Sequence, residues 1–160
     1  MDAMDAMDAM DTADDAEALK HLHNGGDYLR LAERTSNPDV LRQLAQGEYP
    51  FVWHAIASNA AAPTDLLASL SARRNSTWND NCLLRLIAAH SALTGAALGD
   101  LVDLVGDRLA EGGRPFAAVL ALARRPELPA ERLYRLGRQP GASARLRRGI
   151  TRALAERPGR

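Results

Sequence analysis

The sequence predicts an all-α protein, a right-handed α-solenoid of about five stacked helix pairs. Three observations lead to this fold class. A helix–turn–helix pattern recurs along the chain, its apolar residues follow the helical period, and the composition is 46% hydrophobic but only 4% aromatic. A core made of alanine and leucine suits close-packed helices. It disfavours a sheet, where β-branched and aromatic residues dominate.

The clearest copy of the pattern is residues 54–70, HAIASNAAAPTDLLASL. It predicts the end of one helix, a tight turn closed by Pro63, and the start of a second helix. Three leucines that follow the proline fall on one helical face: Leu66, Leu67 and Leu70. The first helix ends on an aliphatic residue, an alanine and, two positions later, a polar residue: Ile56, Ala57 and Asn59.

The same ending occurs in five ordered copies. Its aliphatic positions are Leu31, Ile56, Ile87, Leu122 and Leu154, and its polar positions are Arg34, Asn59, His90, Arg125 and Arg157. Successive copies lie 25, 31, 35 and 32 residues apart. A helix pair of this length buries its apolar face only by stacking on another pair, so the spacing predicts a solenoid. Small side chains are expected to let neighbouring helices approach closely at Ala57, Ala88, Ala123 and Ala155.

The stretch VWHAIASNAAAPTDLLASL resembles the leucine-rich repeat variant, a bacterial relative of HEAT-like repeats. The matching positions are Val52, Ala55, Ile56, Ala57, Asn59, Pro63, Leu66, Leu67 and Leu70. The resemblance covers roughly residues 28–158 and implies a fold and a binding role rather than a reaction. Some members of that family carry an iron–sulfur cluster on a cysteine-rich amino-terminal segment. Cys82 is the only cysteine of this chain, so that feature does not carry over and no cofactor is expected.

Local start and stop signals predict ten helices and no strands. Helix starts are indicated by prolines or capping residues, and helix ends by glycine or asparagine. The expected helices span about residues 13–23, 27–34, 38–46, 50–58, 63–74, 80–89, 94–109, 115–125, 129–137 and 143–157. Asn24-Gly25-Gly26 is expected to stop the first helix, and residues 75–77 are expected to form a loop. Residues 1–12, MDAMDAMDAMDT, are expected to form a disordered acidic leader before a helical repeat domain at 13–160.

The net charge of zero hides a strong asymmetry along the chain. Residues 1–30 carry eight acidic residues against two cations, and residues 105–160 carry thirteen arginines against five acidic residues. Arginine favours bidentate contacts with carboxylates and phosphates. The acidic leader is therefore expected to complement the arginine-rich end, either in its own molecule or, by weak self-association, in a neighbouring copy.

The residues show no sign of catalysis or of metal binding. Catalysis needs a nucleophile with a base, or paired acids, in a pocket, and no such signature is present. Cys82 lies beside two leucines and is interpreted as a small buried apolar residue. His21 and His23 are two residues apart, so on a helix they point in different directions. His90 is expected to bond a backbone group at a helix end. We therefore expect a non-enzymatic protein without a bound metal.

The leading interpretation is a cytoplasmic scaffold that binds another protein or a peptide, without a membrane partner. Its candidate partner-binding residues are Tyr49, Trp53, Asp65, Ser69, Arg73, Trp78, Arg132, Arg135 and Arg138. The concave surface is expected to be lined by the second helix of each pair. The alternative is nucleic-acid or polyanion binding through the C-terminal arginine-rich surface, which HEAT-like alkylpurine DNA glycosylases show to be possible on such a fold.

Overall fold

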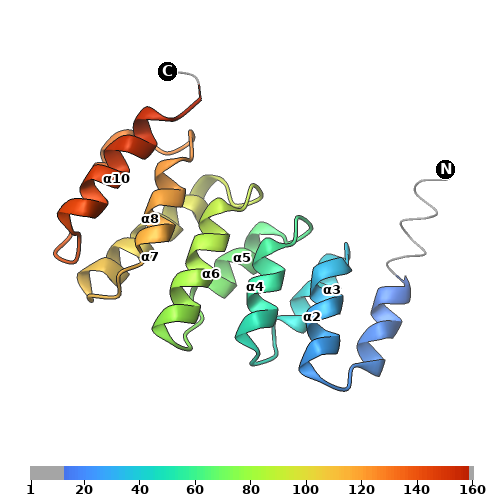
Figure 1. Cartoon of the computed structure of the whole chain (residues 1–160). Helices are drawn as coiled ribbons and strands as arrows, with labels where there is room; N and C mark the ends of the chain where they lie inside the picture. The colour runs from blue at the N-terminus through green and yellow to red at the C-terminus, as the bar shows by residue number, and fades with distance from the viewer. Residues whose placement is uncertain (1–12, 159–160) are drawn as a thin grey trace.

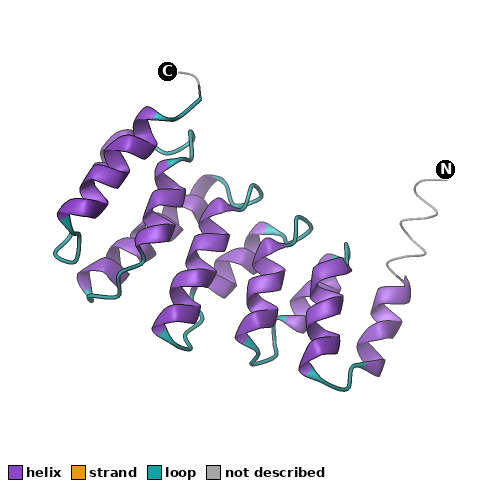
Figure 2. Ribbon diagram, in the orientation of Figure 1, coloured by secondary structure: helices purple, strands orange, loops and turns teal. Residues whose placement is uncertain are grey.

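The computed structural model describes residues 13–158, and all regular structure within them is helical (Figure 2). The all-α prediction is therefore confirmed. Residues 13–18 are helical and run into a short 3₁₀ turn, η1 (Leu19–His21). The other helices are α2 (Gly25–Arg34), α3 (Pro38–Leu44), α4 (Pro50–Ser58), α5 (Thr64–Ser71), α6 (Thr77–Ala89), α7 (Gly95–Ala110), α8 (Phe116–Ala123), α9 (Ala130–Leu136) and α10 (Ala144–Ala155). The expected acidic leader, residues 1–12, lies outside the described part.

The helices form two rows. Figure 1 shows α2, α4, α6, α8 and α10 side by side, each packed against the next; we call these the first-row helices. The helices between them in sequence, α3, α5, α7 and α9, lie behind and form the second row. Each second-row helix packs on a first-row neighbour, as α5 does on α4 and α6. The two ends of the described chain lie at opposite ends of the rows.

Alanine side chains allow the first-row helices to approach closely. Ala32, Ala57, Ala88 and Ala123 are each at most 1% exposed. Large leucines fill the space between the rows, so the core is aliphatic, as the composition predicts. Ala155 was expected to be buried in the same way, but it is exposed. No described helix follows α10, so nothing covers this alanine.

Two helix starts differ from the sequence prediction. Asn24-Gly25-Gly26 does not stop a helix; the Asn24 side chain instead accepts a hydrogen bond from the Asp27 N–H (3.1 Å) and caps the start of α2. The expected loop at residues 75–77 is also shorter. Ser76 caps α6 by accepting from the Asn79 N–H, so Thr77 and Trp78 are already helical.

One polar side chain at the end of each first-row helix crosses to the preceding helix pair. The Asn59 amide donates to the carbonyls of Ala32 and Thr35, at 2.8 and 2.9 Å. At the next junction, His90 Nε2 lies 2.8 Å from the Asn59 carbonyl oxygen. The last carbonyls of a helix have no partner within the helix. Here a side chain from the following pair supplies that partner.

Arg125 takes the same position one pair further along and is only 9% exposed. Its Nη1 donates to the carbonyls of Ala88 and His90 at 3.2 and 2.8 Å, and its Nη2 donates to Leu93 at 2.7 Å. The guanidinium also bonds both carboxylate oxygens of Glu127 and so lowers the pKa of that carboxyl. One arginine thus satisfies three buried acceptors and keeps a counter-ion.

Arg157 completes the series. Its Nε donates to the Ala123 carbonyl at 2.9 Å and its Nη1 to the Leu128 carbonyl at 2.7 Å. In the first copy the polar position is Arg34, whose Nη2 lies 3.5 Å from the nearly buried Asp15 carboxylate, in the preceding helical segment. We call the four side chains that bond carbonyls the joint residues: Asn59, His90, Arg125 and Arg157.

The joint residues share one local backbone turn. The Asn59 N–H bonds the Ile56 carbonyl, and the Asn59 carbonyl accepts from the N–H three residues later. The same two bonds recur at His90 and Arg125. His90 Nδ1 also accepts from the Ala92 N–H (3.1 Å), which leaves the ring proton on Nε2, facing the Asn59 carbonyl. The prediction that His90 bonds a backbone group at a helix end is confirmed.

Enlarging the buried alanines should destabilise the protein. Ala57→Leu and Ala123→Leu are each expected to lower the free energy of unfolding by about 1–3 kcal/mol, because the extra side chain has no space between first-row helices. Ala155→Leu is the matched control and should change it by less than about 0.5 kcal/mol, since this position is exposed. Urea denaturation gives the three values. Equal effects at the three positions would contradict the packing described here.

Replacing Arg125 should be costly even when the charge is kept. Arg125→Lys is expected to lower the free energy of unfolding by about 2–4 kcal/mol, because one ammonium cannot replace the bonds of a guanidinium to three buried carbonyls. Arg124→Lys, at the exposed neighbouring position, is the control and should be nearly neutral. Thermal unfolding followed by circular dichroism measures both. A neutral Arg125→Lys variant would rule out this role for the side chain.

Candidate binding surfaces

The candidate residues on α5 and α9 are largely occupied by contacts within the protein. Asp65 receives two hydrogen bonds from Arg42, at 3.2 and 3.1 Å, which lower the pKa of its carboxyl. Ser69 is exposed, but its hydroxyl donates to the Leu66 carbonyl of its own helix. Arg132 Nη2 bonds both the Gly99 carbonyl and the Asp103 carboxylate at 2.9 Å.

Trp53 is not available to a partner, in contrast to the sequence prediction. It is 5% exposed and its indole N–H donates to the Gly47 carbonyl at 2.8 Å. The guanidinium of Arg73 lies 5.2 Å from the centre of its ring and donates to the Ala45 carbonyl. Both candidates therefore fasten the turn between α3 and α4 to the core.

The remaining two arginine candidates, Arg135 and Arg138, are exposed. Arg135 lies 3.7 Å from Glu131 on the same helix, whereas Arg138 has no ion pair within residues 13–158. Four of the nine predicted site residues are arginines. Arg138 is the one among them whose side chain makes no ion pair or hydrogen bond within the described residues.

Three of the four exposed large aromatic residues of the described chain lie at the starts of first-row helices, and the fourth, Tyr134, lies on second-row α9. Tyr49 and Phe51 are 43% and 42% exposed, and their rings lie 5.2 Å apart at the start of α4. Trp78 is 72% exposed at the start of α6, and the centres of its ring and the His54 ring lie 6.1 Å apart. Tyr28 on α2 continues the row, 5.8 Å from Tyr49. The predicted exposure of Tyr49 and Trp78 is confirmed, whereas their role in binding stays a prediction.

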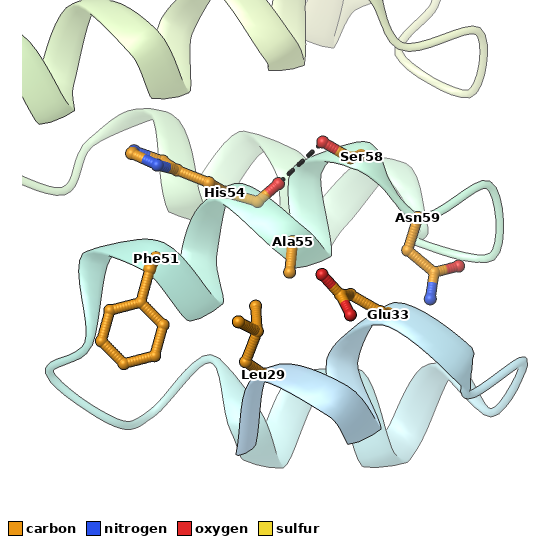
Figure 3. A pocket seen from close by; sticks show the side chains of 7 residues that line it. All are labelled: Leu29, Glu33, Phe51, His54, Ala55, Ser58 and Asn59. Carbon is orange, nitrogen blue, oxygen red and sulfur yellow. Dashed lines mark hydrogen bonds between the residues drawn. The ribbon is translucent and has the colours of Figure 1, made fainter. Parts of the chain in front are cut away.

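A groove of about 340 Å³ lies between α2 and α4 (Figure 3). Leu29 and Glu33 project from α2 toward Ala55 on α4, and Phe51 stands at one end. Glu33 makes no ion pair within the described residues. The groove is therefore of mixed character: Leu29, Phe51 and Ala55 are its apolar lining residues, and Glu33, His54, Ser58 and Asn59 are its polar ones.

A second groove, of about 410 Å³, lies between α6 and α8. It is lined by one leucine and three alanines and by three arginines: Ala89, Ala117, Leu120, Ala121, Arg85, Arg124 and Arg125. Arg125 is paired with Glu127, whereas Arg85 and Arg124 are exposed and contact no carboxylate within residues 13–158. Arg124 has only a long bond, 3.4 Å, to a carbonyl of its own helix.

The exposed side of α10 adds three more free cations to the first row. Arg145, Arg148 and Arg152 recur at helical spacing, and each is exposed and without an ion pair in the described chain. Neither α8 nor α10 contains an acidic residue. The arginine-rich end therefore contains engaged arginines, such as Arg132 on α9 and the joint residues Arg125 and Arg157, and exposed first-row arginines without an ion pair in the described residues.

The nine predicted site residues do not include Phe51, Glu33, Arg85 or Arg124, which the structure places at the surface. The available signal was helical phase: Arg85 and Arg124 lie on faces opposite the buried aliphatic residues of α6 and α8. Residues 13–158 contain no group of three or more His, Cys, Asp or Glu side chains placed to hold a metal ion. Within the same residues, no helix combines the length and the apolar character that crossing a bilayer requires.

Comparison with models of known protein families, with curated proteins and with solved structures finds no match. The function is therefore inferred from the geometry of the chain alone.

Proposed function

We propose that the chain is a non-enzymatic scaffold, a right-handed α-solenoid of the kind that the leucine-rich repeat variant and HEAT-like repeats represent, which binds a peptide or a segment of another protein. The four joint residues support a repeating architecture, because each repeats one contact between neighbouring helix pairs. Folds of this kind present extended surfaces to partners and bring no chemistry of their own.

The observation that carries the proposal is the contrast between the two rows. First-row helices expose aromatic side chains, two grooves whose linings are partly apolar, and arginines without an ion-pair partner in the described residues. Three second-row arginines, Arg42, Arg132 and Arg135, instead pair with acidic residues of the same row, Asp65, Asp103 and Glu131. Aromatic and arginine side chains are the residues that most often dominate binding energy at interfaces. We therefore assign binding to the first-row face rather than to the second-row helices that the sequence suggested.

Selection from a displayed peptide library against the intact chain tests this function. We expect enriched peptides whose affinity falls about tenfold or more in Phe51→Ser/Trp78→Ser, the effect of losing one or two aromatic anchors. Tyr134→Ser is the matched control, because Tyr134 is similarly exposed but lies on second-row α9. Failure to enrich any peptide, or an equal loss in the control, would refute binding at the first-row face.

The arginines of α10 support a second candidate function, polyanion or nucleic-acid binding. Three unpaired guanidiniums along one helix are able to contact successive phosphates. If about three phosphates are neutralised, the logarithm of the affinity for single-stranded DNA should fall with the logarithm of salt concentration with a slope near −2. Arg145→Gln/Arg148→Gln/Arg152→Gln should flatten this slope. Titration by fluorescence anisotropy measures both, and an affinity insensitive to salt excludes this function.

A further inference from the structure

The groove between α6 and α8 combines an apolar floor with two cations. Ala89, Ala117 and Ala121 line the floor, and small side chains allow another backbone to approach closely. Arg85 of α6 and Arg124, the C-cap of α8, also line the groove, as does Arg125, whose charge is paired with Glu127. The groove therefore combines apolar contact with two cations that have no carboxylate partner in the described residues.

Arg85 makes no hydrogen bond or ion pair within residues 13–158, and Arg124 bonds only a carbonyl of its own helix. By contrast, second-row arginines of the same protein form ion pairs with carboxylates: Arg42 with Asp65, and Arg132 with Asp103. An exposed guanidinium gains most from a carboxylate or a phosphate. The positive charges of Arg85 and Arg124 are therefore available to pair with a ligand from another molecule.

The positive charge continues beyond the groove onto α10. Gly149 of α10 packs so closely against Leu120 of α8 that a Cβ atom at position 149 would lie 2.9 Å from a leucine methyl group. This contact holds α10 against α8, and the exposed Arg148 is the residue before this glycine. No acidic side chain on α8 or α10 interrupts the cationic surface.

We propose that the groove between α6 and α8 binds an acidic amphipathic segment of another protein. Its small apolar side chains lie on the alanine floor, and its carboxylates pair with Arg85 and Arg124. This inference deepens the proposed function and rests on it, because it names the partner chemistry for one part of the first-row face. Arg148 extends the cationic surface for a longer acidic segment.

The lining of the groove favours an acidic peptide over nucleic acid. None of the residues that line it is aromatic, whereas grooves for single strands stack bases on aromatic rings. A phosphate backbone also gains nothing from an alanine floor, which an amphipathic helix covers with its own apolar face. The geometry therefore fits carboxylates separated by apolar side chains.

Anisotropy titrations with three labelled probes test the assignment. The first is an amphipathic peptide of about 16 residues made of glutamate, alanine and leucine, a length at which a helix can form. The second has glutamine in place of each glutamate, and the third is an oligothymidylate of similar length. We expect Arg85→Gln/Arg124→Gln to weaken binding of the glutamate peptide about tenfold or more, whereas Arg138→Gln, at an equally free second-row position, leaves it unchanged.

Ala117→Phe separates apolar contact from charge. Ala117 is exposed, so the variant should keep its circular dichroism spectrum and unfolding temperature. It should weaken the glutamate peptide and leave the oligothymidylate unaffected. Three results would overturn the inference: equal binding of the glutamine peptide, equal losses in Arg138→Gln, or tighter binding of the oligothymidylate with the same dependence on Arg85 and Arg124. If library selection enriches peptides that are not acidic, the scaffold function stands and this assignment falls.

Discussion

The structure depends on side chains that satisfy backbone carbonyls across the junctions between helix pairs. Helices as short as α4 and α8 leave about half of their carbonyls without a partner inside the helix, and stacking buries those that face a neighbour. An unsatisfied buried acceptor costs about 1–3 kcal/mol, so each junction needs a donor at a fixed place. Asn59, His90 and Arg125 meet that need with different chemistry, and the arginine reaches three carbonyls where the asparagine reaches two. The residue at this one repeat position therefore stabilises both the local backbone turn and the packing of neighbouring helix pairs.

The same stacking separates the charges of the protein by row. Acidic residues on α5, α7 and α9 lie where second-row arginines can reach them, so Asp65, Asp103 and Glu131 neutralise most of that surface. On the first-row helices, the buried side carries the alanines that pack against neighbouring helices. These helices contain few acidic residues that could pair with the arginines on their exposed side. A net charge of zero therefore coexists with a first-row face on which Arg85, Arg124 and the arginines of α10 remain free. This face is the part of the described surface best suited to an acidic partner.

Sequence periodicity predicted most of the fold but less of the surface. The repeated aliphatic–alanine–polar ending marked the buried alanines and the role of His90, because both depend on position within one helix end. The burial of Trp53 was not predictable from its neighbours, since it requires the Gly47 carbonyl as acceptor and Arg73 from the connection between α5 and α6. Pairing of Arg132 with Asp103, 29 residues apart, likewise follows from stacking rather than from local sequence. Asn24 was misassigned because asparagine before glycine suits either a helix end or a helix start.

Native-state hydrogen exchange on Asn59→Ala tests the central claim most directly. The substitution removes the donor for two carbonyls of the first helix pair and leaves the other joint residues in place. If side chains hold adjacent pairs together, the free energy of opening should fall by about 1–3 kcal/mol for amides of α2 and α3, while amides of α6, α8 and α10 keep their protection. Equal acceleration along the whole chain, or none in α2, would contradict it and would show that alanine packing alone joins the pairs.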